Sequence, residues 1–249
     1  RSRRADIALA AGDAPLAAEH FKRYLEIARE SPRRSEVELT LARILAEDLD
    51  DVAGALAQLS SVLASAPHDL GLRERVIQLA SRAMDWNQVL YQVREIERQR
   101  ASNAERARDQ LRIAAVLRDR IGDPVKARQS LERARQLDPL NLDAVRELAE
   151  LVAGADPSHR ATVLAHAAGD VRGAIAGAPE RAVLYERLAV IAQWQEDLDA
   201  RHYALAALDA LGSLSAEQRQ FVDVARAAVA TQGVPGTKLG DLRRRIGPP

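Results

Sequence analysis

The hydrophobic positions of the chain recur at spacings of three and four residues, the periodicity of an amphipathic helix. The pattern is clearest in IGDPVKARQSLERARQLDP, residues 121–139, where Ala127, Leu131 and Ala134 fall on one face. This stretch opens on Gly-Asp-Pro, which suits the end of one helix and the cap and first turn of the next. It closes on Asp-Pro, which stops a helix. We therefore predict a helix, a tight turn and a second antiparallel helix over residues 104–139.

The same unit recurs along the chain. Residues 5–32, 36–67 and 70–101 each carry two apolar faces separated by a short turn, at Gly-Asp, Leu-Asp-Asp and Met-Asp-Trp respectively. The sequence Glu-Asp-Leu-Asp occurs at 47–50 and again at 196–199, and we expect it at the turn in both places. The small or apolar residues that open each second helix lie at 17, 55, 89, 127, 167 and 204, in steps of 34 to 40 residues. Such a period with two helices per unit indicates an α-solenoid.

Residues 108–139 resemble a tetratricopeptide repeat. The positions that match are Leu111, Ala114, Ala115, Gly122, Asp123, Ala127, Leu131, Ala134 and Pro139. Residues 36–67 match at Leu39, Ala42, Ala55, Leu59 and Pro67. The other units lack the usual aromatic residue and some of the small ones. The resemblance implies an all-α, right-handed superhelical solenoid of antiparallel helix pairs, in which the first helix of each pair lines a concave groove.

We expect residues 1–212 to form an array of about five to six helix pairs. Residues 213–231 are predicted to be a C-terminal capping helix that starts with a Ser215–Gln218 capping box, and residues 232–249 a Gly/Pro-rich tail or linker. The apolar face of the capping helix comprises Phe221, Val222, Ala225 and Val229. Gly169, Gly173 and Gly177 form a row that either packs against another helix or breaks its own; we favour packing.

Composition narrows the function classes. Basic and acidic residues balance at 36 each, so no net charge attracts nucleic acid or a membrane surface. Arginine supplies all but three of the cations, which indicates a high-GC, bacterial genome. There is no cysteine, which excludes disulfides and thiolate sites and is compatible with either cytoplasm or periplasm. We favour the cytoplasm, and the periplasm stays open because a leader before Arg1 would not be visible. No apolar run is long enough to span a membrane.

The sequence contains no phosphate-loop, dinucleotide, zinc-protease, calcium-loop or serine-hydrolase motif. Five histidines are scattered, and the acidic run 47–51 is interpreted as helix capping rather than as a metal site. We therefore predict no enzyme activity, no cofactor and no metal. Two basic clusters, Arg1/Arg3/Arg4 and Arg243/Arg244/Arg245, are interpreted as solvated ends, because a nucleic-acid surface would interleave them with aromatic residues.

The resemblance places a partner-binding groove on the first helices. Its candidate residues are Arg75, Gln78, Arg82, Arg112, Val116, Arg120, Arg146, Glu150 and Tyr185. Five of these are arginines, which bind carboxylates through paired hydrogen bonds, so an acidic segment or a C-terminus is a suitable ligand. The alternative, which we favour, is that each arginine pairs with a neighbouring acid, among them Glu74, Asp109, Asp119 and Glu150. The chaperone-tail clamp of the family is absent, because its positions carry Thr40, Ile44, Arg112 and Val116.

The sequence thus predicts a non-enzymatic scaffold or adaptor that binds a protein or peptide. One alternative is a structural or oligomerisation segment of a larger protein, and a second is the regulatory domain of an enzyme.

Overall fold

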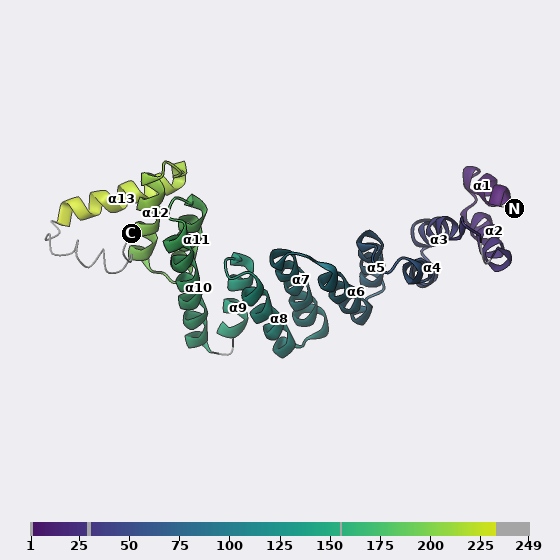
Figure 1. Cartoon of the computed structure of the whole chain (residues 1–249), viewed down its shortest axis with the longest axis horizontal. Coiled ribbons are helices and arrows are strands. Elements are labelled where there is room, and N and C mark those ends of the chain that lie inside the picture. The colour runs from purple at the N-terminus through teal and green to yellow at the C-terminus, as the bar shows by residue number, and fades with distance from the viewer. Residues whose placement is uncertain (1, 29–30, 155, 233–249) are drawn as a thin grey trace. The chain divides into compact units, whose positions relative to one another are not determined.

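The computed structural model describes residues 2–28, 31–154 and 156–232, and every regular element in these ranges is a helix (Figure 1). The all-α class expected from the sequence is confirmed. The chain divides into two compact units, and the boundary falls between Asp123 and Pro124.

The first unit contains three helix pairs and one further helix. Its α-helices are α1 (Ser2–Ala10), α2 (Ala14–Ile27), α3 (Arg34–Arg43), α4 (Val52–Ser65), α5 (Leu70–Arg82), α6 (Trp86–Gln99) and α7 (Asn103–Val116). Two short π-helical turns, η1 (Ile44–Asp48) and η2 (Leu117–Ile121), extend α3 and α7. Helices α1 and α2, α3 and α4, and α5 and α6 pack as pairs, as predicted for residues 5–32, 36–67 and 70–101.

The second unit contains α8 (Pro124–Leu137), α9 (Leu142–Ala153), α10 (Pro157–Gly177), α11 (Ala182–Trp194), α12 (Leu198–Ala210) and α13 (Ala216–Gln232). Helices α9 and α10 pack together, as do α11 and α12 (Figure 1). The two helices expected over residues 104–139 are present as α7 and α8. Their pairing stays a prediction, because the boundary between the units lies in the turn that joins them. A single array over residues 1–212 likewise stays a prediction.

One turn geometry reverses the chain inside four of these pairs. A residue with positive φ is followed by an aspartate whose carboxylate accepts a hydrogen bond from the backbone N–H three residues on. The positive-φ residues are Gly12, Asp50, Met84 and Glu196. The capping bonds run to Asp13 (3.1 Å), Asp51 (2.8 Å), Asp85 (3.0 Å) and Asp197 (2.9 Å). The N–H of each aspartate also donates to a carbonyl of the preceding helix. One residue therefore ends one helix and starts the next.

This turn corrects the register taken from the sequence. The two Glu-Asp-Leu-Asp segments do not superpose, because Asp51 caps α4 beyond the first segment whereas Asp197 caps α12 inside the second. The buried small residue four positions after the cap is Ala17 in α2 and Ala55 in α4. In α12 that position is Arg201, not residue 204. The sequence alignment of this pair was therefore wrong by three residues.

The glycine row of the second unit was also predicted incorrectly. Helix α10 is continuous through Gly169, Gly173 and Gly177, and a methyl group added at any of the three would meet no atom within 4 Å. The helix neither breaks nor packs there. Its buried stripe is Leu164, Ala167, Ala168 and Val171, which lies on another face and carries the contacts with the helices around it.

The last helix covers the end of the second unit. Its start is the predicted capping box: Ser215 Oγ accepts from the N–H of Gln218 at 3.2 Å, and Gln218 Oε1 accepts from the N–H of Ser215 at 2.9 Å. Val222 is fully buried and Phe221 packs in the same cluster, with Leu208 of α12. The side chains of Ala225 and Val229 lie outside the described residues.

The left-handed turn residue yields a stability prediction. Met84 has φ 55°, a left-handed backbone conformation that costs free energy for any residue with a Cβ. Met84 is 72% exposed, so packing of its side chain does not offset this cost. We expect Met84→Gly to raise the free energy of unfolding by about 0.5–1 kcal/mol, because relief of that penalty exceeds the added entropy of the unfolded chain. Urea denaturation followed by circular dichroism measures the change. Met84→Ala, which keeps a Cβ, is the control and should leave stability unchanged; equal stabilisation by both would contradict this explanation.

Candidate functional site

Arg112, the central candidate of the expected groove, is already bound within the first unit. Both of its terminal nitrogens donate to Glu74, at 2.8 Å each, which ties α7 to α5. Arg112 also donates to Asp109 at 3.3 Å. The hydrogen bond to Glu74 raises the pKa of Arg112, and the charges of Glu74 and Asp109 add to the effect. Both of the paired donors of Arg112 therefore face Glu74, and binding of a partner's carboxylate by this guanidinium stays a prediction.

Arg82 is similarly occupied. Its guanidinium donates to the carbonyl oxygen of Ala46 at 3.2 Å and to the carboxylate of Asp50 at 2.9 Å. These bonds join the end of α5 to the turn before α4, and they satisfy carbonyl and carboxylate groups left by that turn. Arg82 thus holds consecutive helix pairs together.

The remaining candidates of the first unit are less engaged. Arg75 and Gln78 are exposed on α5, and within the described ranges Arg75 forms no ion pair. Arg120 lies over the ring of Trp86, 5.0 Å from its centroid, which is a cation–π contact. Val116 is partly buried on α7.

The last three candidates lie in the second unit. Arg146 on α9 is paired with Asp143 at 3.3 Å, and Glu150 is exposed on the same helix. Tyr185 on α11 lines a pocket. The favoured alternative, that arginines pair with neighbouring acids, is thus confirmed at Arg112, whose partners Glu74 and Asp109 were expected. Arg82 and Arg146 are also paired, with Asp50 and Asp143, which were not among the acids named from the sequence.

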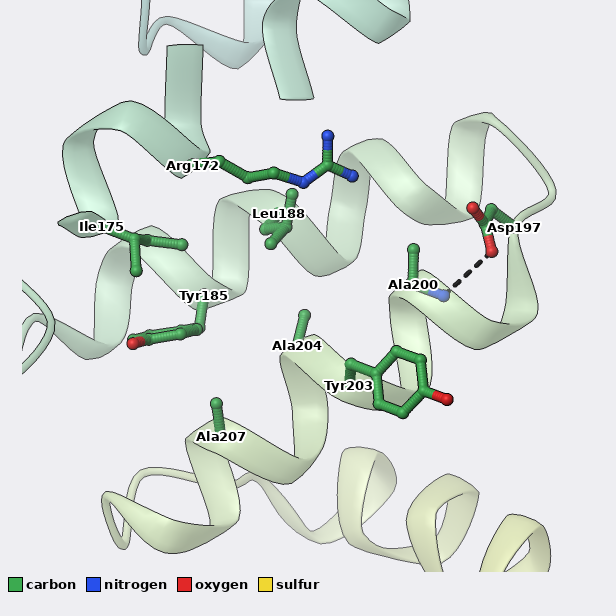
Figure 2. A pocket seen from close by; sticks show the side chains of 9 residues that line it. All are labelled: Arg172, Ile175, Tyr185, Leu188, Asp197, Ala200, Tyr203, Ala204 and Ala207. Carbon is green, nitrogen blue, oxygen red and sulfur yellow. Dashed lines mark hydrogen bonds between the residues drawn. The ribbon is translucent and has the colours of Figure 1, made fainter. Parts of the chain in front are cut away.

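The pocket at Tyr185 is the strongest candidate site in the second unit. It has a volume of about 490 Å³ and lies between α10 and α12, which both pack on α11 (Figure 2). Figure 2 shows its lining: Arg172 and Ile175 from α10, Tyr185 and Leu188 from α11, and Asp197, Ala200, Tyr203, Ala204 and Ala207 around α12. The three alanines form a wall without long side chains, so the space between the two tyrosines stays open.

Of the two charged side chains that line this pocket, Asp197 is engaged in a helix cap and Arg172 is available to a ligand. Asp197 accepts the helix-capping hydrogen bond from Ala200 and thereby starts α12. Arg172 is exposed, and in the described part of the chain it has no acidic partner. Its guanidinium extends over the pocket above Leu188 (Figure 2). The pocket therefore combines an aromatic and aliphatic interior with one available cation.

Tyr185 was a candidate from the sequence, whereas Arg172 and Tyr203, which line the same pocket, were not. Arg172 stands between Gly169 and Gly173, in the row that was interpreted as a packing face. Tyrosine is rare in this chain, with four in 249 residues, and two of the four line this pocket. That rarity was an available signal.

The sequence matches no protein-family model and no curated protein. Among solved structures it is similar to a tetratricopeptide repeat protein from Parabacteroides merdae, at 11% identity over 98% of this chain and 96% of that chain, with a TM-score of 0.43. It is also similar to MamA, at 15% identity over 63% and 86% of the two chains, with a TM-score of 0.41. A third is YrrB, described as a tetratricopeptide protein with an unusual peptide-binding site, at 16% identity over 84% and 99%, with a TM-score of 0.37. With TM-scores below 0.5, these likenesses assign no site.

Within residues 2–28, 31–154 and 156–232, no group of three or more His, Asp or Glu side chains is placed to hold a metal ion. No helix there is both long and apolar enough to cross a bilayer.

The structural role of Arg112 can be measured. We expect Arg112→Gln to lower the free energy of unfolding by about 1 kcal/mol, since the lost pair is bidentate but partly solvent-exposed. Because the hydrogen bond to Glu74 raises the pKa of Arg112, its guanidinium stays charged over the range tested, and the loss should be constant from pH 6 to about pH 9. Arg75→Gln is the matched control and should change stability by less than about 0.5 kcal/mol. Equal losses in both variants would show that the pair with Glu74 contributes nothing specific.

Proposed function

We propose that this chain is a non-enzymatic protein-interaction module that binds a partner through the pocket of its second unit. The partner would supply an apolar side chain beside a carboxylate. The observation that carries the proposal is the combination in one cavity of Tyr185, Leu188 and Tyr203 with Arg172, a cation that lacks an acidic partner in the described residues.

The lining supports binding rather than chemistry. It offers no nucleophile next to a base, and its single carboxylate, that of Asp197, is engaged at the start of α12. Tyrosine and arginine are the residue types that most often dominate protein interfaces, because they bury large areas and still make polar contacts. A guanidinium at the edge of an apolar pocket fixes the orientation of a carboxylate that enters with an apolar group.

The proposal also moves the binding site from its expected place. The sequence placed it on the first helices, at the arginines headed by Arg112. Arg82, Arg112 and Arg146 are bound within the fold, whereas Arg172, on a second helix, lines the pocket and has no acidic partner in the described residues.

Selection of displayed random peptides on the immobilised protein tests this proposal. We expect the enriched peptides to share a large apolar residue next to an acidic residue or a C-terminus. Arg172→Gln should weaken their binding about ten- to a hundredfold, the loss expected for a hydrogen bond between charged groups. Arg146→Gln is the matched control in the same unit and should bind normally, because Arg146 pairs with Asp143 away from the pocket.

Two results would contradict the proposal. Failure to enrich any peptide on the folded wild-type protein would remove the interaction function and favour a structural segment. Enriched peptides that bind Arg172→Gln as tightly as wild type would place the site elsewhere.

A further inference from the structure

A second pocket opens in the first unit, between α1 and α2. It has a volume of about 540 Å³, and its lining is Arg3, Arg4, His20, Arg23, Tyr24 and Ile27. The two helices are joined by the tight turn at Gly12-Asp13, so the start of α1 lies beside the end of α2. The four residues from α2 are His20, Arg23, Tyr24 and Ile27. They lie three or four residues apart along the helix and therefore share one edge of it.

The lining is basic and contains no carboxylate. In the part of the chain that the structure describes, Arg3, Arg4 and Arg23 form no ion pair. Asp6, the one acidic residue of α1, does not line the pocket. Guanidinium groups that share a cavity repel one another. An anion bound between them makes the net electrostatic energy of the cavity favourable.

The number of cations favours a phosphate ligand over a carboxylate. A carboxylate has two oxygens and is satisfied by the paired donors of one arginine. Three arginines offer more donors than one carboxylate can accept, whereas a diphosphate presents enough oxygens for all of them. Arginine also matches the geometry of phosphate oxygens with two parallel hydrogen bonds.

The rest of the lining fits an organic group. The hydroxyl of Tyr24 is hydrogen-bonded to Ser31 Oγ at 2.8 Å, which fixes the orientation of the ring. Ile27 is 57% exposed beside it, although it is a large apolar side chain. Together they form an apolar surface next to the arginines, against which a ring can pack.

We propose that the pocket between α1 and α2 binds a small organic polyphosphate of the nucleoside diphosphate class. Arg3, Arg4 and Arg23 hold the phosphates, and the organic group lies against Tyr24 and Ile27. The N-terminal arginines were interpreted from the sequence as a solvated end without aromatic neighbours. For Arg3 and Arg4 the fold changes that interpretation, because it places Arg23 and Tyr24 next to them; Arg1 and Arg243–Arg245 lie outside the described residues.

Isothermal titration calorimetry with four probes tests the proposal: ADP, inorganic pyrophosphate, adenosine and a peptide of glutamates, each without added metal. We expect ADP to bind more tightly than pyrophosphate, and adenosine to show no binding. Arg23→Gln should weaken ADP binding about ten- to a hundredfold. Lys22→Gln removes the same charge from the neighbouring position of α2, but Lys22 lines a different cavity, with Leu25, Glu26 and Arg34. It should bind ADP within about twofold of wild type, since only non-specific attraction is lost.

Each other outcome would overturn the proposal. Equal losses in Arg23→Gln and Lys22→Gln would show that attraction by net charge, not the pocket, holds the ligand. Equal affinities for ADP and pyrophosphate would show that Tyr24 and Ile27 do not bind the organic group and that the pocket binds inorganic anions only. Tighter binding of an acidic peptide of glutamates than of ADP would mean that the ligand is a protein segment. Circular dichroism of both variants confirms that α1 and α2 still form.

Discussion

Reversal of the chain between helices is the constraint on which the rest of this structure depends. In four helix pairs the reversal uses a left-handed residue followed by an aspartate that closes one helix with its N–H and opens the next with its carboxylate. Because the same aspartate is hydrogen-bonded to both helices, the turn fixes which faces of the two helices meet. It also sets which residues lie side by side at the open end of the pair, which is how Arg3 and Arg4 come to lie beside Arg23.

Because aromatic residues are scarce, the helix pairs use polar contacts as well as apolar ones to hold their spacing. Glu38 is almost fully buried, accepts a hydrogen bond from Ser61 at 2.9 Å and forms an ion pair with Arg34 at 3.0 Å. Asp109 is also buried and accepts from Arg100 at 3.1 Å as well as from Arg112. Buried acids of this kind are stable only when their hydrogen bonds are complete, so the arginines that complete them are structural. The large number of arginines therefore indicates little about binding until their partners are known.

The two pockets differ in chemistry because they contain different numbers of arginines that lack an acidic partner. In the described residues, the pocket of the first unit contains three such arginines, Arg3, Arg4 and Arg23. The pocket of the second unit contains one, Arg172, in a lining that includes tyrosine, leucine and alanine. Three cations suit a ligand with many acceptor oxygens. A single cation beside apolar walls suits a carboxylate attached to an apolar group. The proposed ligands follow from this difference in charge density.

The sequence by itself determined the helices and the turns between them. The signals for both, which are the period of hydrophobic residues and the Gly, Pro and Asp residues at helix ends, act over only a few residues. It was correct for the pairs at 5–32, 36–67 and 70–101 and for the capping box at Ser215. It failed where the answer depended on contacts between distant residues. The row at Gly169 faces open space, the last pair is shifted by three residues, and Arg82 is bound to Asp50, which is 32 positions away. Only the tertiary structure decided which arginines are satisfied internally and which remain available, because a charge is cancelled by its neighbours in space and not by its neighbours in the chain.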